Sequence, residues 1–421
     1  MKSKIKSALK TAALAGTVLF ASWLLQPVVQ KIRHQCVIRP TGVSEVSAVP
    51  AFARKYKLAC TECHSAFPAL NEFGREFKIL GYVREPKSVE GAQEVKTEPW
   101  SQVLEQMFPW GAIVKARPLD SRNGPTSRKK IRALHELELF IAGGNIAKDF
   151  SYFTEIEMED ETAFAPAVGE LQVGYHPFRF LNVLAANRSF WAMDPYQTLS
   201  NMGILTVNKR NFATLGPVSG VTMDDMKQTM ALYGEALKEG VGSVYYSMGV
   251  SADKSDDEGE GPKDFSVRLA LDSLKGVAIG GFGDFGEQEW VGDTKNTKYR
   301  YARAGVDALV ELAGLNFRTA FVTLFDRDNS VAVNRDQHNR AAYLEGFYTV
   351  MKGDLPIFVP LLRYDWHETT NKTKTIAAVT AQVGTYFRPN ARVYTEYRSE
   401  VNTPPGDPKD ARWTLQAEVG F

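Results

Sequence analysis

From Trp110 onward, apolar and polar residues alternate along runs of about ten residues, and clusters of Gly, Pro, Asn and Asp separate the runs. The last run is the most regular, because every odd-numbered position from Ala411 to Phe421 is apolar while the even-numbered positions carry Arg, Thr, Gln, Glu and Gly. Leu137, Leu139 and Ile141 likewise alternate with Glu136 and Glu138, and residues 377–386 show the same period of two. This alternation predicts β-strands with one apolar and one polar face.

The number of runs predicts a mainly β fold. Sixteen runs share residues 110–421, and a tilted strand needs only about 9 to 11 residues to cross a membrane. An even number of strands is typical of bacterial outer-membrane barrels, so we predict an antiparallel outer-membrane β-barrel of about 16 strands. A soluble periplasmic β domain stays open as the alternative, because it would show similar alternation. The strands are expected to start near residues 110, 130, 150, 168, 180, 228, 242, 264, 277, 298, 314, 340, 356, 374, 391 and 411.

The connections between the runs alternate in length, as in up-and-down barrels with tight periplasmic turns and longer external loops. Short connections are expected at 273–276, 311–313, 352–355 and 388–390, and long ones at 251–263, 285–297, 326–339, 367–373 and 401–410. The stretch from Trp191 to Lys227 fits neither class and is expected to be a long external excursion, folded over or into the mouth. A last strand ending in Phe421 also resembles the C-terminal aromatic signal of outer-membrane barrels.

Composition narrows the class of protein further. The 421 residues include 50 Lys plus Arg and 49 Asp plus Glu, a net charge of +1, so no nucleic-acid partner is expected. With 24% charged residues and a mean hydropathy of −0.25, the chain is not a helical membrane protein, whose spans need about 20 nearly uncharged residues each.

The first 48 residues are expected to be a signal peptide or an uncleaved anchor, followed by a linker. Four lysines within the first ten residues precede an apolar stretch from Ala12 to Val29, which is the pattern of a secretory signal. Together with the barrel, this signal predicts the outer membrane of a Gram-negative bacterium. Cys36 follows the apolar stretch and has no assigned role.

The sequence Cys60-Thr61-Glu62-Cys63-His64 is the attachment motif of a c-type haem. In that chemistry Cys60 and Cys63 bind the porphyrin and His64 ligates the iron, so these three residues are the predicted cofactor site and one covalent haem c the predicted cofactor. A zinc half-site would need two further Cys or His ligands, and a redox dithiol would favour a βαβ context. The sequence offers neither.

A small helical module, residues 49–95, is predicted around this motif, and a linker, residues 96–109, joins it to the barrel of residues 110–421. The apolar residues Phe67, Leu70, Phe73, Phe77 and Leu80 recur at helical spacing, with Pro68 at the front and Gly81 behind. About 33 residues, 50–82, are fewer than the roughly 40 that a domain usually needs. We therefore expect another part of the chain to cover the haem, with the module plugging the barrel lumen or its periplasmic mouth.

The module has no ordinary sixth ligand of its own. The next methionine and histidine after His64 are Met107 and His135. Four methionines follow in the long excursion, Met193, Met202, Met223 and Met226. Each of these residues is a candidate ligand, and an iron with an open sixth position is the alternative.

Arg54, Arg75 and Lys78 could pair with haem propionates. Glu155, Glu157 and Glu159, beside Glu136 and Glu138, form the densest carboxylate cluster of the barrel, which could gather metal cations or simply line a charged lumen.

The whole arrangement resembles the fused cytochrome-porins of iron-oxidising bacteria. The specific likeness covers about 35 residues: 48–54 (AVPAFAR), the haem motif, and then Pro68, Leu70, Phe73-Gly74-Arg75, Phe77-Lys78 and Gly81-Tyr82. The resemblance implies a monohaem protein that takes electrons from extracellular Fe(II) and passes them to periplasmic cytochromes. It also implies that Cys60 and Cys63 are thioether sites and His64 the proximal ligand. Lys55-Tyr56-Lys57 departs from the Gln-Thr-Gly usual in the iron oxidases, which leaves the donor open.

Three functions therefore remain from the sequence. The first is outer-membrane electron transfer from an extracellular donor such as Fe(II) to a periplasmic c-type cytochrome or other carrier, with Fe(II) oxidase activity left open and no catalytic residue assigned. The second is a haem-bearing porin for solute passage. The third is a soluble periplasmic haem protein.

Overall fold

The computed structural model describes residues 52, 58–82, 110–124, 126–144, 149–200, 205–207, 223, 225–238, 242–252, 263–274, 276–291, 296–328, 336–353, 355–369, 374–388 and 390–420. The signal or anchor (1–48), Cys36, the linker and Phe421 lie outside these ranges. None of the helices in the described ranges has the length and apolar character needed to cross a bilayer.

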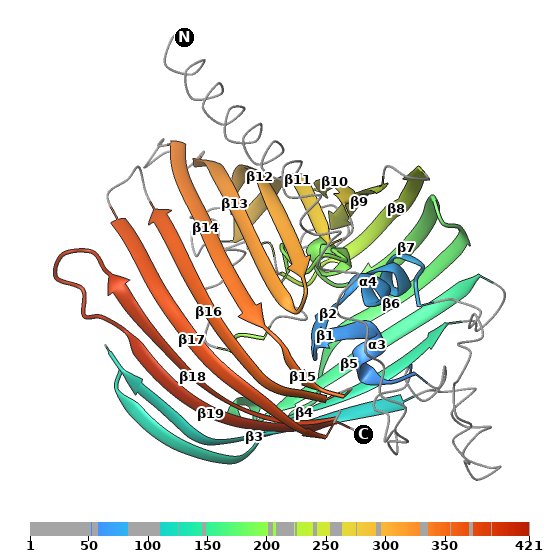
Figure 1. The fold of residues 1–421 in the computed structure, drawn as a ribbon. Helices are drawn as coiled ribbons and strands as arrows, with labels where there is room; N and C mark the ends of the chain where they lie inside the picture. Colours follow the sequence, from blue (N-terminus) through green and yellow to red (C-terminus); the bar gives the residue numbers. More distant parts are fainter. Residues whose placement is uncertain are drawn as a thin grey trace. The chain divides into compact units, whose positions relative to one another are not determined.

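The described strands β3 to β19 close into one antiparallel barrel, in which each strand pairs with its sequence neighbours and β19 pairs with β3 (Figure 1). β14 and the three-residue β15 both pair with β16, so together they fill one place in a ring of sixteen. The strands are β3 (Trp110–Asn123), β4 (Arg128–Gly144), β5 (Phe150–Glu159), β6 (Ala167–Phe178), β7 (Leu181–Asn187), β8 (Gln228–Lys238), β9 (Gly242–Ala252), β10 (Lys263–Leu274), β11 (Val277–Val291), β12 (Asn296–Leu312), β13 (Leu315–Asp328), β14 (Asp336–Tyr348), β15 (Val350–Lys352), β16 (Leu355–Thr369), β17 (Lys374–Arg388), β18 (Ala391–Asn402) and β19 (Ala411–Gly420).

The predicted barrel is confirmed, including its strand number. The largest difference in a strand start is at β14, expected near residue 340 and found at Asp336. The connections expected to be long at 285–297, 326–339 and 367–373 are shorter, because the flanking strands continue to pair. The last pairs are Val291 with Asn296, Arg327 with Asp336, and Thr369 with Lys374. These strands are longer than the bilayer requires, so they extend beyond it.

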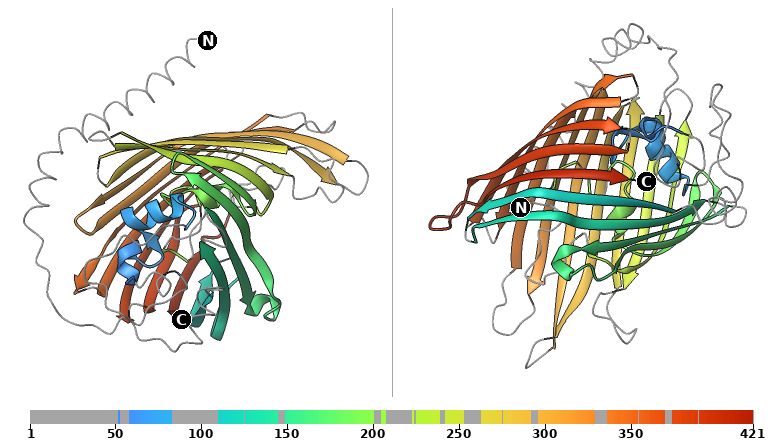
Figure 2. Two further views of the ribbon diagram at one scale, coloured as in Figure 1. Left: turned by 90° about the vertical axis from the view of Figure 1, so that its right-hand side faces the viewer. Right: turned by 90° about the horizontal axis from the view of Figure 1, so that it is seen from below.

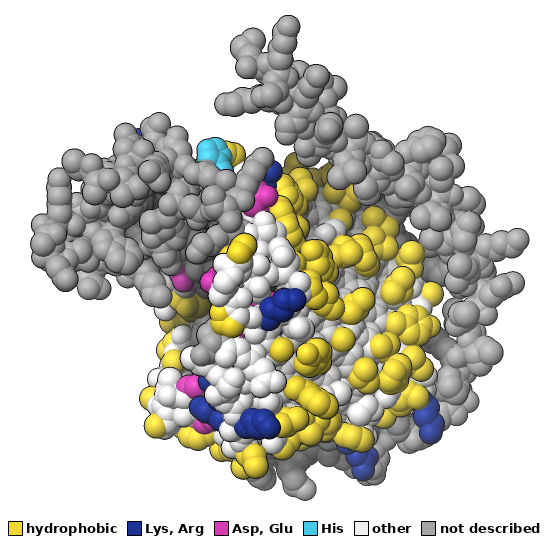
Figure 3. Space-filling model, turned by 90° about the vertical axis from the view of Figure 1, so that its left-hand side faces the viewer, with side chains coloured by type: hydrophobic (Ala, Val, Ile, Leu, Met, Phe, Trp, Pro, Cys, Tyr) yellow, Lys and Arg dark blue, Asp and Glu magenta, His cyan; other side chains and the backbone are white. Residues whose placement is uncertain are grey.

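The barrel is apolar outside and polar inside, the reverse of a soluble protein. On β19, Trp413 is 54% exposed, whereas Thr414 and Glu418 are 0% and 5% exposed. The same alternation holds across the ring, and Figure 3 shows one wall covered largely by hydrophobic side chains. Only a closed barrel can place strands with such a surface in lipid, because it leaves no backbone edge unpaired. The soluble β domain is therefore excluded, and the predicted location in the outer membrane of a Gram-negative bacterium is confirmed.

A short N-terminal segment lies inside the ring of strands (Figure 2). It consists of helix α3 (Cys60–Cys63), the paired strands β1 (His64–Ala66) and β2 (Ala69–Leu70), and helix α4 (Glu72–Ile79). The helix predicted from Pro68 onward is thus wrong at its start. Asn71 ends the β1–β2 hairpin and caps α4, since its side-chain oxygen accepts a hydrogen bond from the backbone N–H of Gly74 at 3.0 Å.

The excursion between β7 and β8 folds into the lumen in its described part. It begins with the buried 3-10 helix η2 (Phe190–Met193), and the Asp194 carboxylate then accepts hydrogen bonds from the backbone N–H groups of Tyr196, Thr198 and Leu199. The same carboxylate lies 3.2 Å from Arg268 on β10. A buried acid thus organises the loop and ties it to the nearby strand β10.

Candidate functional site

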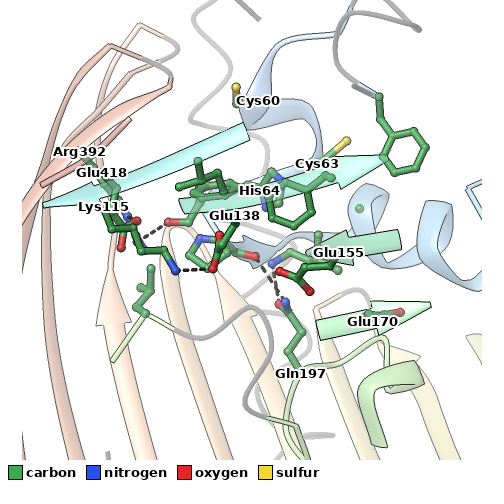
Figure 4. A pocket seen from close by; sticks show the side chains of 18 of the residues that line it. Cys60, Cys63, His64, Lys115, Glu138, Glu155, Glu170, Gln197, Arg392 and Glu418 are labelled. Atoms are coloured by element: carbon green, nitrogen blue, oxygen red, sulfur yellow. Dashed lines mark hydrogen bonds and ion pairs between the residues drawn. The ribbon is translucent and has the colours of Figure 1, made fainter. Parts of the chain in front are cut away.

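A cavity of about 580 Å³ lies between the N-terminal segment and the inner wall of the barrel (Figure 4). Its volume falls within the usual range of cofactor pockets, about 300–1,000 Å³. The segment contributes Cys60, Cys63 and His64, so the structure brings all three predicted site residues to one cavity. The opposite side is formed by β3, β4, β5, β6, β18 and β19 and by the folded-in loop.

His64 has the properties of a metal-ligating imidazole. Burial lowers the pKa of its ring to about 4, although the neighbouring backbone carbonyls of Pro68 and Ala69 act in the opposite direction. The ring is therefore neutral, which is the form that binds a metal ion. Its Nδ1 is buried and has no hydrogen-bond partner among the residues that the structure describes. A buried ring nitrogen without a hydrogen-bond partner fits a site in which a bound cofactor supplies the partner.

The two thiols line the same cavity from helix α3. Burial, then the charges of Glu62 and Cys60, raise the pKa of the Cys63 thiol to about 12. A redox dithiol needs the opposite, a thiolate stabilised at neutral pH. Among the described residues that line the cavity, His64 is the only His and Cys60 and Cys63 are the only Cys, so the further Cys or His ligands of a structural zinc site are not there. The donor set fits a c-type haem better than either alternative.

Asn71 and Gly74 hold the motif in its conformation. The Asn71 side-chain amide donates to the carbonyl oxygens of Thr61 and Glu62, each at 3.0 Å, which ties α3 to the start of α4. At Gly74, a Cβ atom would lie 2.1 Å from the carbonyl oxygen of Cys63. Only glycine allows α4 to approach the haem motif this closely.

Contacts at the short-turn end of the barrel fix the segment in the lumen. Arg75, 3% exposed, donates to Glu311 at 2.7 Å, two residues before the turn between β12 and β13. The carbonyl oxygen of Phe67 accepts from Arg392 at 2.6 Å, next to the turn between β17 and β18. Glu76 pairs with Arg179, in the turn between β6 and β7, at 2.7 Å. Short turns face the periplasm in bacterial barrels, so the described part of the segment lies at the periplasmic end, where we predicted it.

Aromatic rings form one side of the cavity. Tyr82 stacks on Phe52 with 4.9 Å between ring centroids and on Phe153 of β5 with 5.9 Å, and Phe153 lies 6.1 Å from Phe140 of β4. Phe77 packs edge-on against Tyr82 at 5.6 Å. Such a continuous apolar surface, shared by the segment and the barrel, can bind one face of a flat macrocycle.

Charged residues form the facing side, and most of them are paired. Lys115 of β3 lies 3.0 Å from Glu136 and also binds Glu138, both on β4. Glu418 pairs with Arg392, and Glu170 pairs with Arg188. The remaining carboxylates are those of Glu155 and Glu157 on β5, which line the cavity as well.

The basic residues expected at the haem propionates have other partners. Arg75 is held by Glu311, and the Lys78 ammonium donates to the backbone carbonyl oxygens of Ala192 at 2.7 Å and Asp194 at 3.1 Å. Burial, then repulsion by Arg188, lowers the pKa of Lys78 to about 8. Arg54 lies outside the described residues. The basic residues that the barrel contributes to the cavity are Lys115, Arg117, Arg188 and Arg392.

Of the candidates for a sixth haem ligand, those that the structure describes, His135, Met193, Met223 and Met226, do not line the cavity. His135 lies instead beside Asp160, with Nδ1 2.9 Å from the carboxylate, and Arg132 contacts both. Met193 and Met223 are buried in the loop and do not line the cavity in the described part of the chain. Met107 and Met202 lie outside the described residues. The expectation for His135 is therefore wrong, because an ion-pair cluster near the external end of β4 holds its ring.

Comparison with solved structures finds barrels of the same architecture. The anion-selective porin from Comamonas acidovorans aligns with a TM-score of 0.55 and 12% identity, over 75% of this chain and 99% of that chain. The barrel has the porin fold. OmpT of Vibrio cholerae gives a TM-score of 0.53 at 10% identity, over 78% and 100% of the two chains, and OmpF of Salmonella typhi in complex with daunomycin gives 0.52 at 10%, over 75% and 97%. No protein-family model and no curated protein matches the chain.

The sequence predicted the Cys60, Cys63 and His64 site but not the wall that faces it. Lys115, Arg392 and Gln197 come from three distant parts of the chain, and each is one of many inward-facing polar residues at a period of two. Gln197, which accepts a hydrogen bond from the backbone N–H of Leu70 at 2.7 Å, belongs to a loop with no periodic pattern. These residues come together only through the register of strand pairing in the closed barrel, which the sequence pattern does not define.

Proposed function

We propose that this outer-membrane barrel is an electron-transfer protein that carries one covalent haem c at Cys60, Cys63 and His64. It would pass electrons from an extracellular donor, of which Fe(II) is one candidate, to a periplasmic c-type cytochrome or other carrier. This is the function of the fused cytochrome-porins that the N-terminal motif resembles.

The observation that carries the proposal is the position of the motif. Its two sulfur atoms and the imidazole line a single cavity, and the opposite wall of that cavity belongs to the barrel. A segment of this size cannot enclose a macrocycle alone. The barrel supplies the missing cover, so motif and cavity fit each other.

When bound, a haem c supplies one-electron exchange at its iron. The residues of the chain have three tasks around it. Cys60 and Cys63 would attach the group, and His64, neutral because of its burial, would ligate the metal. The aromatic rings of Tyr82 and Phe153 exclude water from one side, while the ion pairs of the segment with the wall hold it across the lumen.

Stopped-flow absorbance of the purified haem-loaded protein tests this function. We expect the haem band to change to the reduced form on mixing with Fe(II), and to be reoxidised by a ferric c-type cytochrome. A correctly loaded haem that neither Fe(II) nor another extracellular reductant reduces would contradict electron transfer.

A second candidate is solute passage, which the porin fold of the barrel favours. Ion conductance in planar bilayers separates the two. The segment contacts β12 and β18, and the folded-in loop contacts β17, so both lie across the lumen and electron transfer predicts a conductance well below that of an open porin. A porin-like current through the haem-loaded protein would favour solute passage.

A further inference from the structure

The carboxylates on β4 and β5 are arranged as a binding site for a metal cation. One oxygen atom from each of Glu136, Glu138 and Glu157 lies within 4.8 Å of the other two. Oxygen ligands bind Ca²⁺ at about 2.3–2.6 Å, so ligands on opposite sides of one ion are about 5 Å apart. The three oxygens are thus already spaced as the ligands of one cation would be.

Glu155 is an independent indication that a cation is missing from this wall. It is 6% exposed and lines the cavity, and it has no hydrogen bond or ion pair with any described residue (Figure 4). The carboxylates of Glu138, Glu170 and Glu157 each repel it more strongly than Lys115 attracts it. A buried carboxylate without a partner is costly unless a ligand neutralises it.

The charges of the cluster do not balance. Glu138 and Glu157 occupy directly opposite positions on β4 and β5, where like charges destabilise a sheet. Lys115 offers one positive charge to four carboxylates, and its ion pairs with residues that the structure describes are those with Glu136 and Glu138. Arg188 and Arg392 are paired with Glu170 and Glu418. The excess negative charge therefore belongs to Glu155 and Glu157.

We propose that Glu136, Glu138 and Glu157 bind one divalent metal cation in the haem cavity and that Glu155 adds the charge that holds it there. Carboxylate oxygens select hard cations such as Mn²⁺, Mg²⁺ and Ca²⁺. Binding of the cation follows from the cluster alone. A role for the bound ion as electron donor beside the haem rests in addition on the proposed function.

Titration of the full-length, haem-loaded protein with Mn²⁺ tests the site, because the EPR signal of free Mn²⁺ decreases on binding. We expect one Mn²⁺ per chain. The double variant Glu155→Gln/Glu157→Gln should weaken binding by about ten-fold or more, since it removes the two uncompensated charges. Glu287→Gln is the matched control: Glu287 pairs with Arg300 and lies outside the cavity, so this variant should bind as the parent does.

A Lys115→Met variant gives a second test, because a misfolded protein would lose affinity for Mn²⁺ rather than gain it. It removes the competing ammonium, so the affinity for Mn²⁺ should increase rather than fall. A parent protein that binds no Mn²⁺, or glutamine variants that bind it unchanged, would overturn the proposal. A chain that binds Mn²⁺ at these glutamates while its haem exchanges no electrons would overturn only the proposed function.

Discussion

At the scale of single residues, the spacing of Cys60, Cys63 and His64 was enough to predict a haem site. The contacts that hold these residues in place depend on steric details that the sequence does not reveal. The need for glycine at position 74 becomes visible only when α4 is seen to touch the backbone of Cys63. The periodic apolar residues around it, Phe73 and Phe77, could indicate a helix but not this contact.

We predict that Gly74→Ala lowers the haem content. The new Cβ would lie 2.1 Å from the carbonyl oxygen of Cys63, and overpacking of this kind costs about 1–3 kcal/mol. The haem-to-protein ratio of the purified chain, from its pyridine haemochrome spectrum, measures the effect. In the control Gly384→Ala, the Cβ would meet no atom closer than 3.7 Å, so a normal ratio is expected. Equal haem content in both variants would show that the close approach is not required.

At the scale of elements, the period of two predicted the strands well, because apolar residues face the lipid and polar residues the lumen along the membrane-spanning part of each strand. The N-terminal helix was predicted too long for a physical reason. Apolar spacing from Phe67 to Leu80 does not distinguish a helix from a hairpin followed by a helix, and the cap at Asn71 decides where α4 begins.

Asn71→Ala should destabilise α4 by about 1 kcal/mol, because the N–H of Gly74 and two carbonyl oxygens of α3 lose their partner. Hydrogen exchange of the α4 amides, followed by mass spectrometry, measures this change. Asn71→Asp keeps the acceptor for Gly74 and loses the two donated bonds, so an intermediate effect is expected. If Asn71→Ala exchanges as slowly as the parent, the cap does not stabilise the segment.

Arg75→Met should loosen the segment from the wall and increase ion conductance. It removes the buried pair with Glu311, which joins α4 to the end of β12 and leaves a carboxylate without its partner. Recordings in planar bilayers should show more frequent or larger openings than in the parent. The control Arg300→Met removes an exposed pair with Glu287 and should leave the conductance unchanged. Identical currents in both variants would mean that this pair does not close the lumen.

At the scale of the whole molecule, alternation alone left open which face of the sheet is buried. The exposure of Trp413 and the burial of Glu418 on the same strand decide it, because only lipid tolerates that orientation. The position of the N-terminal segment was predicted from its small size. The inward fold of the loop around Asp194 was one of two possibilities, since no period in the sequence defines it.

Charges on the outer surface should destabilise the barrel according to depth. Leu362, 60% exposed in β16, lies well within its strand, whereas Met351, 43% exposed, lies next to the turn at Gly353. Leu362→Arg should cost about 2–4 kcal/mol and Met351→Arg only about 0–1 kcal/mol. Urea titrations of folding into lipid vesicles measure both. Equal costs would contradict the assignment of this surface to the bilayer.

The central claim is that the barrel carries a covalent haem in the cavity beside His64. The most direct measurement is the intact mass, together with the pyridine haemochrome spectrum, of the full-length chain extracted from outer membranes of cells that produce the haem-attachment machinery. The account predicts one haem per chain, lost in Cys60→Ala/Cys63→Ala although the barrel still shows heat-modifiable migration. A folded outer-membrane barrel of the parent sequence without covalent haem would contradict it.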